Sequence, residues 1–212
     1  MARNNPGWSG PGQSVKPAGV PVLIVDGHPD GSPERYVHAL AEAYRAGAEA
    51  AGHRATLIRV CDLSFPLLSN RADFESGTVP QPLQDSVRAL ATAGHIVILY
   101  PLWLGDMPAM LKGYLEQIAR PGVAFNPGAK DGSTAKLLSG KSARVIVTMG
   151  MPGLFYRWYF RAHSLKSLVR NILRFCGVHP VRTTTIGMVE SLSVARRQRW
   201  LARMRELGTL AR

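Results

Sequence analysis

The turn after the first apolar run of the chain combines residue types that could bind an anion. Residues 20–25 are continuously apolar, and residues 26–35 then read Asp-Gly-His-Pro-Asp-Gly-Ser-Pro-Glu-Arg. Ser32 is a favoured N-cap residue, and Pro33 would occupy the first helical position, where its missing N–H is not needed. A turn with free amides and a hydroxyl before a helix N-terminus predicts an anion site. The turn lacks the GxGxxG of dinucleotide folds and the Gly-Lys-Ser/Thr of a P-loop, so a turn that binds nothing is the alternative.

A second segment is apolar where a loop is normally polar. Residues 95–99 have the pattern of a buried strand, and Pro101 ends it because proline lacks the N–H that a central strand needs. Residues 102–105 are Leu-Trp-Leu-Gly, and Pro108 then opens a helix at its first turn. Such a loop suits a flat aromatic ligand. The residues leave open the alternative that the loop folds onto its own core.

Strands and helices are expected to alternate along the chain. The expected strands are residues 20–25, 55–60, 95–99, 143–148 and part of 181–189. The first expected helix begins at Ser32-Pro33 and ends at Gly52, and others are expected at 82–93, 108–118 and 194–207. A further helix, between the fourth and fifth strands, is expected to end at Phe175. Residues 69–80 and 119–140 are expected to be irregular. This alternation predicts a parallel sheet with helices on both faces, and ligands of such sheets bind beyond the carboxyl ends of the strands. We therefore expect one crevice surrounded by the loops 27–35, 101–107 and 149–156.

Length and composition predict one domain. The chain has 212 residues, of which 46% are apolar, which is enough for one sizeable core. Residues 1–19 are rich in Gly, Pro, Ser and Asn, so we expect a flexible arm followed by a single domain over 20–212. No apolar run approaches the roughly 20 residues of a membrane span and no signal pattern is present, so the expected location is the cytoplasm. Cys61 and Cys176 form no redox or metal motif and are expected to be reduced and structural, and no metal site is expected.

Positive charge is concentrated in the last third of the chain. The net charge is +12, and residues 139–212 contain 14 Lys/Arg residues but only Glu190 and Glu206 as acidic residues. Such a surface could attract nucleic acid, an anionic membrane, an acidic protein or phosphorylated small molecules, or it could simply be solvated. Neither zinc-finger spacing nor an RNP-type aromatic motif is present, so nucleic acid is not an expected partner.

Three blocks of the chain resemble the flavodoxin-like NAD(P)H:quinone oxidoreductases, a group that includes the DT-diaphorases, the modulator-of-drug-activity-B proteins and the ancillary proteins of potassium-efflux systems. The first block runs from Gly27-His28-Pro29 to Arg35, and the second joins Pro101-Leu102-Trp103 to the Pro-Ala-x-Leu-Lys-Gly order of residues 108–113. The third is Val147-Thr148-Met149-Gly150, followed by Tyr156. The resemblance implies a flavodoxin-like three-layer α/β sandwich, with a five-stranded parallel sheet of order 2-1-3-4-5.

The resemblance also implies a bound flavin, FAD or FMN, and assigns residues to it. The positions that match the phosphate end are His28, Ser32, Pro33 and Arg35. Those that match the loop along the isoalloxazine ring are Pro101, Leu102, Trp103 and Leu104. Those that match the loop beside N1 and O2 of the ring are Thr148, Met149, Gly150 and Met151. Tyr156 and His163 match the catalytic pair that stabilises the charge of reduced flavin, with His163 one residue away from the family spacing.

The implied activity is hydride transfer from NADH or NADPH through the flavin to a quinone. Because donor and acceptor would use the same open face of the flavin, a ping-pong mechanism is expected; azo, nitro and free-flavin compounds are alternative acceptors. The relatives imply a homodimer in which each subunit completes the other's site. The alternative function is a flavin-binding regulatory subunit of a membrane transporter of the potassium-efflux type. In that case the basic C-terminal third, including an arginine-rich terminal helix, would contact the transporter or the membrane.

Overall fold

The computed structural model describes residues 19–128 and 134–212, and these residues are built around one parallel sheet. Its strands, in spatial order, are β2 (Arg54–Arg59), β1 (Pro21–Asp26), β3 (His95–Pro101), β6 (Ser142–Thr148) and β7 (Val181–Ile186). This confirms the predicted order 2-1-3-4-5. A small antiparallel pair, β4 (Phe125–Asn126) and β5 (Ala135–Lys136), lies in the segment predicted to be irregular. Residues 1–18 of the predicted arm lie outside the described residues, so the proposed domain boundary stays a prediction.

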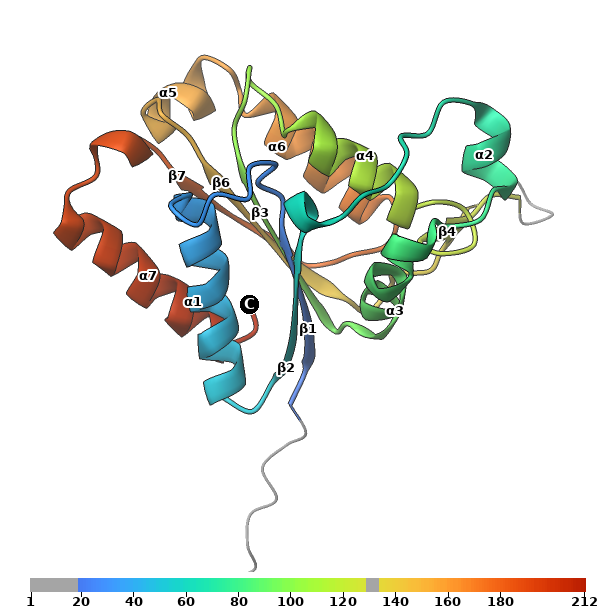
Figure 1. Cartoon of the computed structure of the whole chain (residues 1–212), viewed down its shortest axis with the longest axis horizontal. Coiled ribbons are helices and arrows are strands. Elements are labelled where there is room, and N and C mark those ends of the chain that lie inside the picture. The colour runs from blue at the N-terminus through green and yellow to red at the C-terminus, as the bar shows by residue number, and fades with distance from the viewer. Residues whose placement is uncertain (1–18, 129–133) are drawn as a thin grey trace, which may run out of the picture.

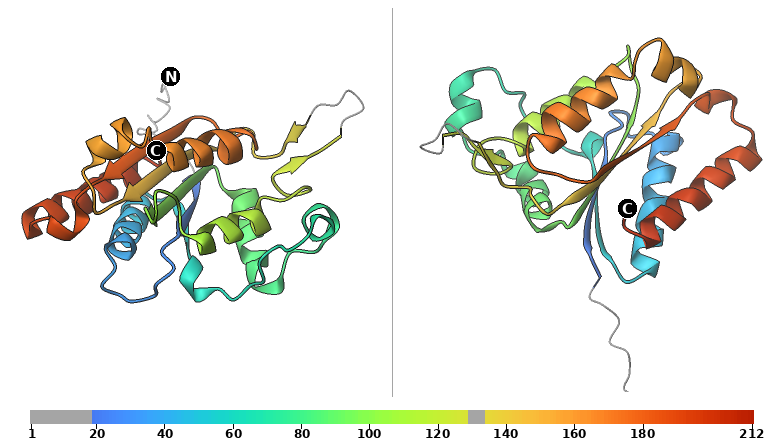
Figure 2. Two further views of the ribbon diagram at one scale, coloured as in Figure 1. Left: turned by 90° about the horizontal axis from the view of Figure 1, so that it is seen from above. Right: turned by 180° about the vertical axis from the view of Figure 1, so that it is seen from behind.

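Helices cover both faces of the sheet (Figures 1 and 2). One face carries α1 (Tyr36–Ala50) and α7 (Val194–Thr209). The other carries α3 (Gln84–Thr92), α4 (Ala109–Ile118), α6 (His163–Ser167) and the π-helical segment η3 (Leu168–Arg174). The remaining short helices are η1 (Val60–Asp62), α2 (Arg71–Ser76), η2 (Gln81–Leu83), α5 (Gly153–Trp158) and η4 (Val189–Ser191). No helix within the described parts of the chain is both long and apolar enough to cross a membrane.

The apolar runs of the sequence form the central strands because both of their faces are covered. In β1, Val22 and Ile24 pack under α1 and α7, whereas Leu23 and Val25 pack under α3 and α4. All residues of β3 are buried. A central parallel strand needs apolar side chains on both faces, so its sequence is continuously apolar rather than alternating.

Helices α1 and α7 approach each other closely at two glycines. A Cβ atom on Gly47 would lie 2.0 Å from the carbonyl oxygen of Arg205, and one on Gly208 would lie 2.2 Å from that of Tyr44. Only glycine permits this contact between backbones. The contact fixes α7 against the first helix, and the N-terminal half of α7 thereby lies beside the loop after β1.

The first helix begins later than predicted. Ser32 and Pro33 belong to a turn in which the N–H of Arg35 donates to the carbonyl of Ser32, and α1 starts at Tyr36 with Arg35 at the N-cap. The amide of Ser32 donates to the carboxylate of Asp30, so the local hydrogen bonds of this Asp replace the expected Ser cap. The prediction that Ser32 caps the helix is therefore wrong.

Two further segments differ from expectation. Residues predicted to be irregular include α2, whose first turn is capped by Asn70. The helix predicted to end at Phe175 is divided into α5, α6 and η3, because Arg161 and Ala162 both have left-handed backbone angles between α5 and α6.

Candidate active site

A cleft of about 420 Å³ lies at the carboxyl ends of β1, β3 and β6. Its lining residues that were predicted as site residues are His28, Arg35, Pro101, Leu102, Trp103, Thr148, Met149 and Gly150. Those that were not predicted as site residues are Asp30, Glu34, Tyr36, Val37, Val189, Glu190 and Arg197. The three loops expected to surround one crevice therefore meet, and a fourth segment after β7 joins them.

Backbone hydrogen bonds hold these loops together at the edge of the sheet. The N–H of Gly27 donates to Leu99 O at 2.7 Å, and that of Leu102 donates to Thr148 O at 2.7 Å. The loop after β6 is joined to the loop after β7 by the bond from Val189 N to Met149 O, at 3.1 Å. The cleft walls thus extend from a hydrogen-bonded sheet edge, which makes the site rigid.

The loop after β1 directs its donors at a carboxylate of the chain itself. Oδ1 of Asp30 accepts from the amide of Ser32 at 2.8 Å, and Oδ2 accepts from the guanidinium of Arg35 at 2.6 and 2.7 Å. The Ser32 amide and then the Arg35 side chain lower the pKa of Asp30. The predicted anion-binding turn therefore binds an anion, which is the Asp30 carboxylate of the turn itself.

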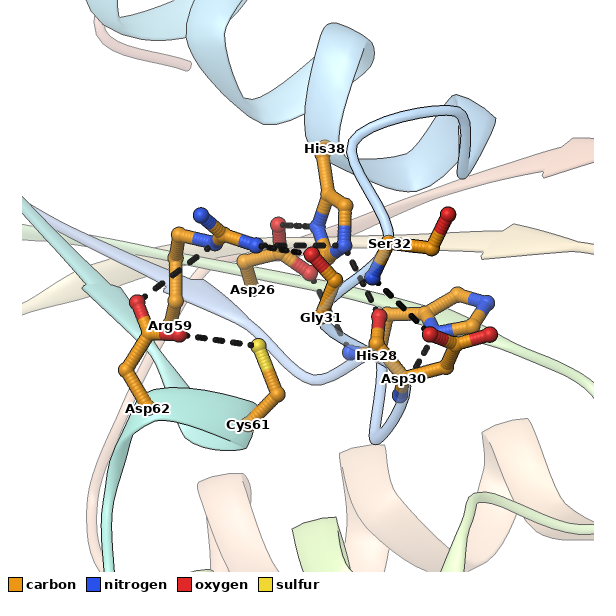
Figure 3. A network of polar contacts seen from close by, with 9 residues as sticks. All are labelled: Asp26, His28, Asp30, Gly31, Ser32, His38, Arg59, Cys61 and Asp62. Carbon is orange, nitrogen blue, oxygen red and sulfur yellow. Dashed lines mark hydrogen bonds and ion pairs between the residues drawn. The ribbon is translucent and has the colours of Figure 1, made fainter.

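Two buried residues, Asp26 and His38, hold this loop through hydrogen bonds (Figure 3). Nδ1 of His38 lies 2.5 Å from Oδ2 of Asp26, and Nε2 of His38 lies 3.0 Å from the carbonyl oxygen of Asp30. Oδ1 of Asp26 accepts from the amide of His28 at 3.1 Å. The end of β1 and the first turn of α1 are thereby linked through side chains, and the loop between them has a fixed shape. No motif in the sequence marked His38 as part of the site.

His28 presents a neutral imidazole to the cleft. Its Nδ1 accepts from the amide of Asp30 at 3.1 Å, so in the neutral ring Nε2 carries the proton. Burial lowers the pKa of His28, and the nearby His38 lowers it further. The ring meets Trp103 edge to face, with 5.9 Å between the centroids. His28 therefore offers one N–H donor beside an aromatic wall.

The loop after β3 forms a tight hairpin at the mouth of the cleft. Trp103 and Asp106 exchange both backbone hydrogen bonds, at 2.8 and 2.9 Å. The two residues between them, Leu104 and Gly105, have φ angles of 49° and 82°, as a type I′ turn requires. Glycine adopts this conformation without cost, but a leucine is strained there. Leu104 is also fully exposed, whereas Leu102 packs against the core.

The fourth wall comes from the chain after β7. The guanidinium of Arg197 lies 4.9 Å above the ring of Tyr36 and donates to the carbonyl of Val189 at 2.6 Å. The Tyr36 hydroxyl donates in turn to Arg197 O at 2.8 Å. Arg197 was expected to be part of a basic helix surface, but its side chain is held at the cleft. Its role depends on the packing of α7 against α1, which the sequence pattern did not reveal.

Six predicted site residues do not line the cleft: Ser32, Pro33, Leu104, Met151, Tyr156 and His163. Tyr156 is buried, and its hydroxyl lies 3.2 Å from Ser164 Oγ and accepts from the amide of Leu165. His163 is exposed at the start of α6. In the single chain, this tyrosine and histidine are therefore not brought together at the cleft.

The cleft combines an anion-binding part with an apolar part. One part of the lining carries Arg35 and Asp30, and Arg35 together with the Ser32 amide already binds an oxyanion in the form of the Asp30 carboxylate. Another part of the lining has apolar surface from Leu102, Trp103 and Met149 for a flat ring. Across the described ranges 19–128 and 134–212, no group of three or more His, Cys, Asp or Glu residues is placed to hold a metal ion.

Comparisons with known proteins agree with this fold. A family model described as flavodoxin-like fold matches residues 21–207. A protein of Haemophilus influenzae named as an uncharacterized NAD(P)H oxidoreductase is 26% identical over 169 residues, which are 78% of this chain and 82% of the relative. An FMN-dependent NADH:quinone oxidoreductase of Beijerinckia indica is 26% identical over 59% of this chain and 62% of its own length. The structure of an NAD(P)H:quinone oxidoreductase from Methanothermobacter marburgensis superposes with a TM-score of 0.72 at 22% identity, covering 91% of this chain and 96% of that protein.

Proposed function

The chain belongs to the family of flavodoxin-like fold, and from this premise we propose that it is an FMN-dependent NAD(P)H oxidoreductase that reduces a quinone or a similar acceptor. The observation that carries the proposal is the cleft at the carboxyl edge of the sheet, with an anion-binding turn in one part of its lining and an apolar wall in another. Relatives named as NAD(P)H and FMN-dependent NADH:quinone oxidoreductases support the same class of reaction. We propose FMN rather than FAD because the curated relatives that name a flavin name FMN.

The turn after β1 would hold the FMN phosphate. Arg35 can serve a phosphate through two N–H groups, and it would exchange its internal partner Asp30 for the ligand. The Ser32 amide and the Nε2–H of His28 are the other donors at this end. Pro33 restricts the backbone between Ser32 and Arg35, so its role would be to shape the turn.

The loops after β3 and β6 would position the flavin ring. Pro101, Leu102 and Trp103 would give it an apolar wall, and Thr148, Met149 and Gly150 line the cleft beside them. When bound, FMN would supply the hydride chemistry that links NAD(P)H to the acceptor. The residues of the chain orient the ring, exclude water from one of its faces and place dipoles where charge develops. A charge-stabilising role of Tyr156 and His163 stays a prediction, and it would require the Tyr156 hydroxyl to leave Ser164.

We further propose that two copies of the chain associate through an apolar surface beside the cleft. This aromatic patch consists of Trp103, Leu104, Leu154, Phe155, Trp158 and Tyr159, all of which are exposed. The β3–α4 loop and α5, which carry these residues, both stand at the edge of the sheet where the strands end (Figure 1). Exposed apolar patches of this kind commonly mark protein interfaces. A second copy would cover the patch and close the cleft from solvent.

The central test is the identity and function of the bound cofactor. We expect the purified protein to be yellow, to release FMN on denaturation as identified by mass spectrometry, and to oxidise NADH or NADPH when a quinone is added. Parallel initial-rate lines are expected because one flavin face serves both substrates in turn. A colourless protein that binds neither FMN nor FAD would refute the proposal.

A regulatory role on a membrane transporter stays the second proposal. It is favoured by the excess positive charge of residues 139–212. A protein that binds FMN, shows no turnover with any quinone, azo or nitro acceptor, and is retained by a transporter domain would support it. The cytoplasmic location expected from the sequence also stays a prediction.

A further inference from the structure

A second and larger hollow lies along β7, at the opposite side of the molecule from β2. Its volume is about 930 Å³, and it shares no lining residue with the flavin cleft. Its floor includes Thr183, Thr184 and Thr185 of β7. The segment that runs from α5 to η3 forms one wall, and α7 forms the other. In the right-hand view of Figure 2, β7 runs uncovered between α6 and α7. We call this hollow the β7 groove.

The backbone of β7 is open toward the β7 groove. Among the residues that the structure describes, strand β7 pairs only with β6, through bonds that include Ala143 N to Pro180 O and Met149 N to Ile186 O. Because neighbouring residues of a strand point their N–H and C=O groups in opposite directions, the even-numbered residues bond β6. Thr183 and Thr185 therefore direct their N–H and C=O groups outward, and within residues 19–128 and 134–212 these groups have no hydrogen-bond partner. Such an edge is a template for one more strand.

The walls of the β7 groove are cationic. One wall carries five exposed cations that form no ion pair with any carboxylate in the described ranges: Arg157, Arg161, Lys166, Arg170 and Arg174. In the floor, Arg144 donates to Thr184 Oγ1 at 2.8 Å and to the carbonyl of Arg212 at 2.6 Å. Across the groove, Arg203 pairs with Glu206. None of the described residues that line the groove is acidic.

We propose that the β7 groove binds an acidic peptide segment in extended conformation, which adds a strand to β7. The open backbone groups of Thr183 and Thr185 would supply main-chain hydrogen bonds, and the cationic wall would select carboxylate side chains on the peptide. A second copy of the chain fits this edge poorly, since two such walls would bring like charges together. A polynucleotide would satisfy the charge but would leave the strand edge unused. This binding site is additional to the proposed reductase activity and does not depend on it.

The test uses the full chain and a synthetic peptide as long as the six residues of β7, with alternating Glu and Val and a fluorescent label. Binding is followed by fluorescence anisotropy, and amide protection by hydrogen exchange. We expect saturable binding and protection of the amides of Thr183 and Thr185. The same peptide N-methylated at every second residue serves as the control, because N-methylation removes donors while the charge is kept. N-methylation of the residues whose amides face β7 should abolish binding. N-methylation of the alternate residues, whose amides face away from β7, should leave binding intact.

Two double variants test the location. Arg170→Ala with Arg174→Ala removes charge from the β7 groove, whereas Arg199→Ala with Arg205→Ala removes the same charge from the exposed face of α7 outside it. We expect the affinity for the peptide to fall roughly tenfold in the first variant and to change less than about threefold in the second. Equal losses in both variants, or no effect of N-methylation in either register, would overturn the proposal. Equal binding of single-stranded DNA with no protection at Thr183 and Thr185 would instead identify a general polyanion surface.

Discussion

Nδ1 of His38 lies 2.5 Å from Oδ2 of Asp26, and both side chains are buried beneath the loop after β1. The second ring nitrogen of His38 faces the carbonyl of Asp30 at 3.0 Å. Through its two ring nitrogens His38 therefore bridges the Asp26 carboxylate and the Asp30 carbonyl, and the Arg59 guanidinium also lies 3.4 Å from Nε2. This contact connects the end of the first strand to the helix that follows the anion-binding turn.

Asp26→Asn should destabilise the fold and distort the turn. The substitution removes the charge that His38 faces and places an amide against one of the two ring nitrogens. Breaking a buried pair typically costs about 3 kcal/mol or more, so we expect the free energy of unfolding in urea to fall by this amount. Glu75→Gln, which breaks the exposed pair with Arg71, is the control and should cost less than about 1 kcal/mol. Equal losses in both variants would show that the buried pair has no special role.

Arg35→Ala should weaken binding of FMN but not of riboflavin, which lacks the phosphate. A hydrogen bond to a charged group contributes about 1.5–3 kcal/mol, so we expect the dissociation constant for FMN to rise between roughly tenfold and a hundredfold. Titration of the apoprotein, followed by quenching of flavin fluorescence, measures both constants. If riboflavin affinity falls as much as FMN affinity, Arg35 shapes the cleft rather than binding the phosphate.

Asp30→Asn should strengthen FMN binding. The Asp30 carboxylate occupies the guanidinium of Arg35 and would compete with the phosphate for it. An asparagine keeps an oxygen that can accept from the Ser32 amide, so the turn should persist while the charge is lost. The same titration should give a lower dissociation constant for FMN and an unchanged one for riboflavin. A weaker FMN complex would mean that Asp30 is needed to orient Arg35.

The sheet and three walls of the cleft were predictable because they depend on local patterns and one general rule. The continuous apolar runs marked the central strands, and parallel topology placed the loops that contain His28, Trp103 and Gly150 at one edge. Arg35, which lines the cleft, was assigned from the resemblance, in which its position matches the phosphate end of the flavin. These inferences needed no knowledge of distant contacts.

The remaining features depend on packing between distant segments. Arg197 reaches the cleft only because α7 packs closely against α1 at Gly47 and Gly208. Tyr156 was assigned from its position in a motif, but the direction of its ring is decided by the packing of α5 and α6 around it. The sequence contained no periodic or motif signal for either relationship.

His95 should make the fold less stable in mild acid. It is buried between the hydroxyls of Tyr44 and Ser142, and burial lowers its pKa to about 4 from an ordinary value of 6.5. Between these two pH values the unfolded chain takes up a proton that the folded chain does not, so stability falls as the pH decreases from 6.5 to about 4. The difference corresponds to a loss of about 3 kcal/mol.

Urea unfolding at a series of pH values measures this contribution. We expect His95→Gln to lower stability at neutral pH and to remove most of the dependence between pH 6.5 and about 4. His163→Gln, which alters an exposed histidine, should leave the pH profile unchanged. An unaltered profile in the His95 variant would assign the acid sensitivity to other groups.

Leu104 combines backbone strain with full exposure, and two substitutions should separate these properties. Its φ of 49° costs about 1 kcal/mol or more in a leucine, and asparagine tolerates this conformation better than alanine does. Both Leu104→Asn and Leu104→Ala remove the apolar side chain from the aromatic patch. We therefore expect both variants to weaken association of the chain, measured by analytical ultracentrifugation over a range of concentrations. Between them, the Asn variant should have the larger free energy of unfolding, by up to about 1 kcal/mol, because it relieves the strain. If both variants associate as the natural chain does, the strained leucine is not part of an interface between copies, and the patch would need another occupant.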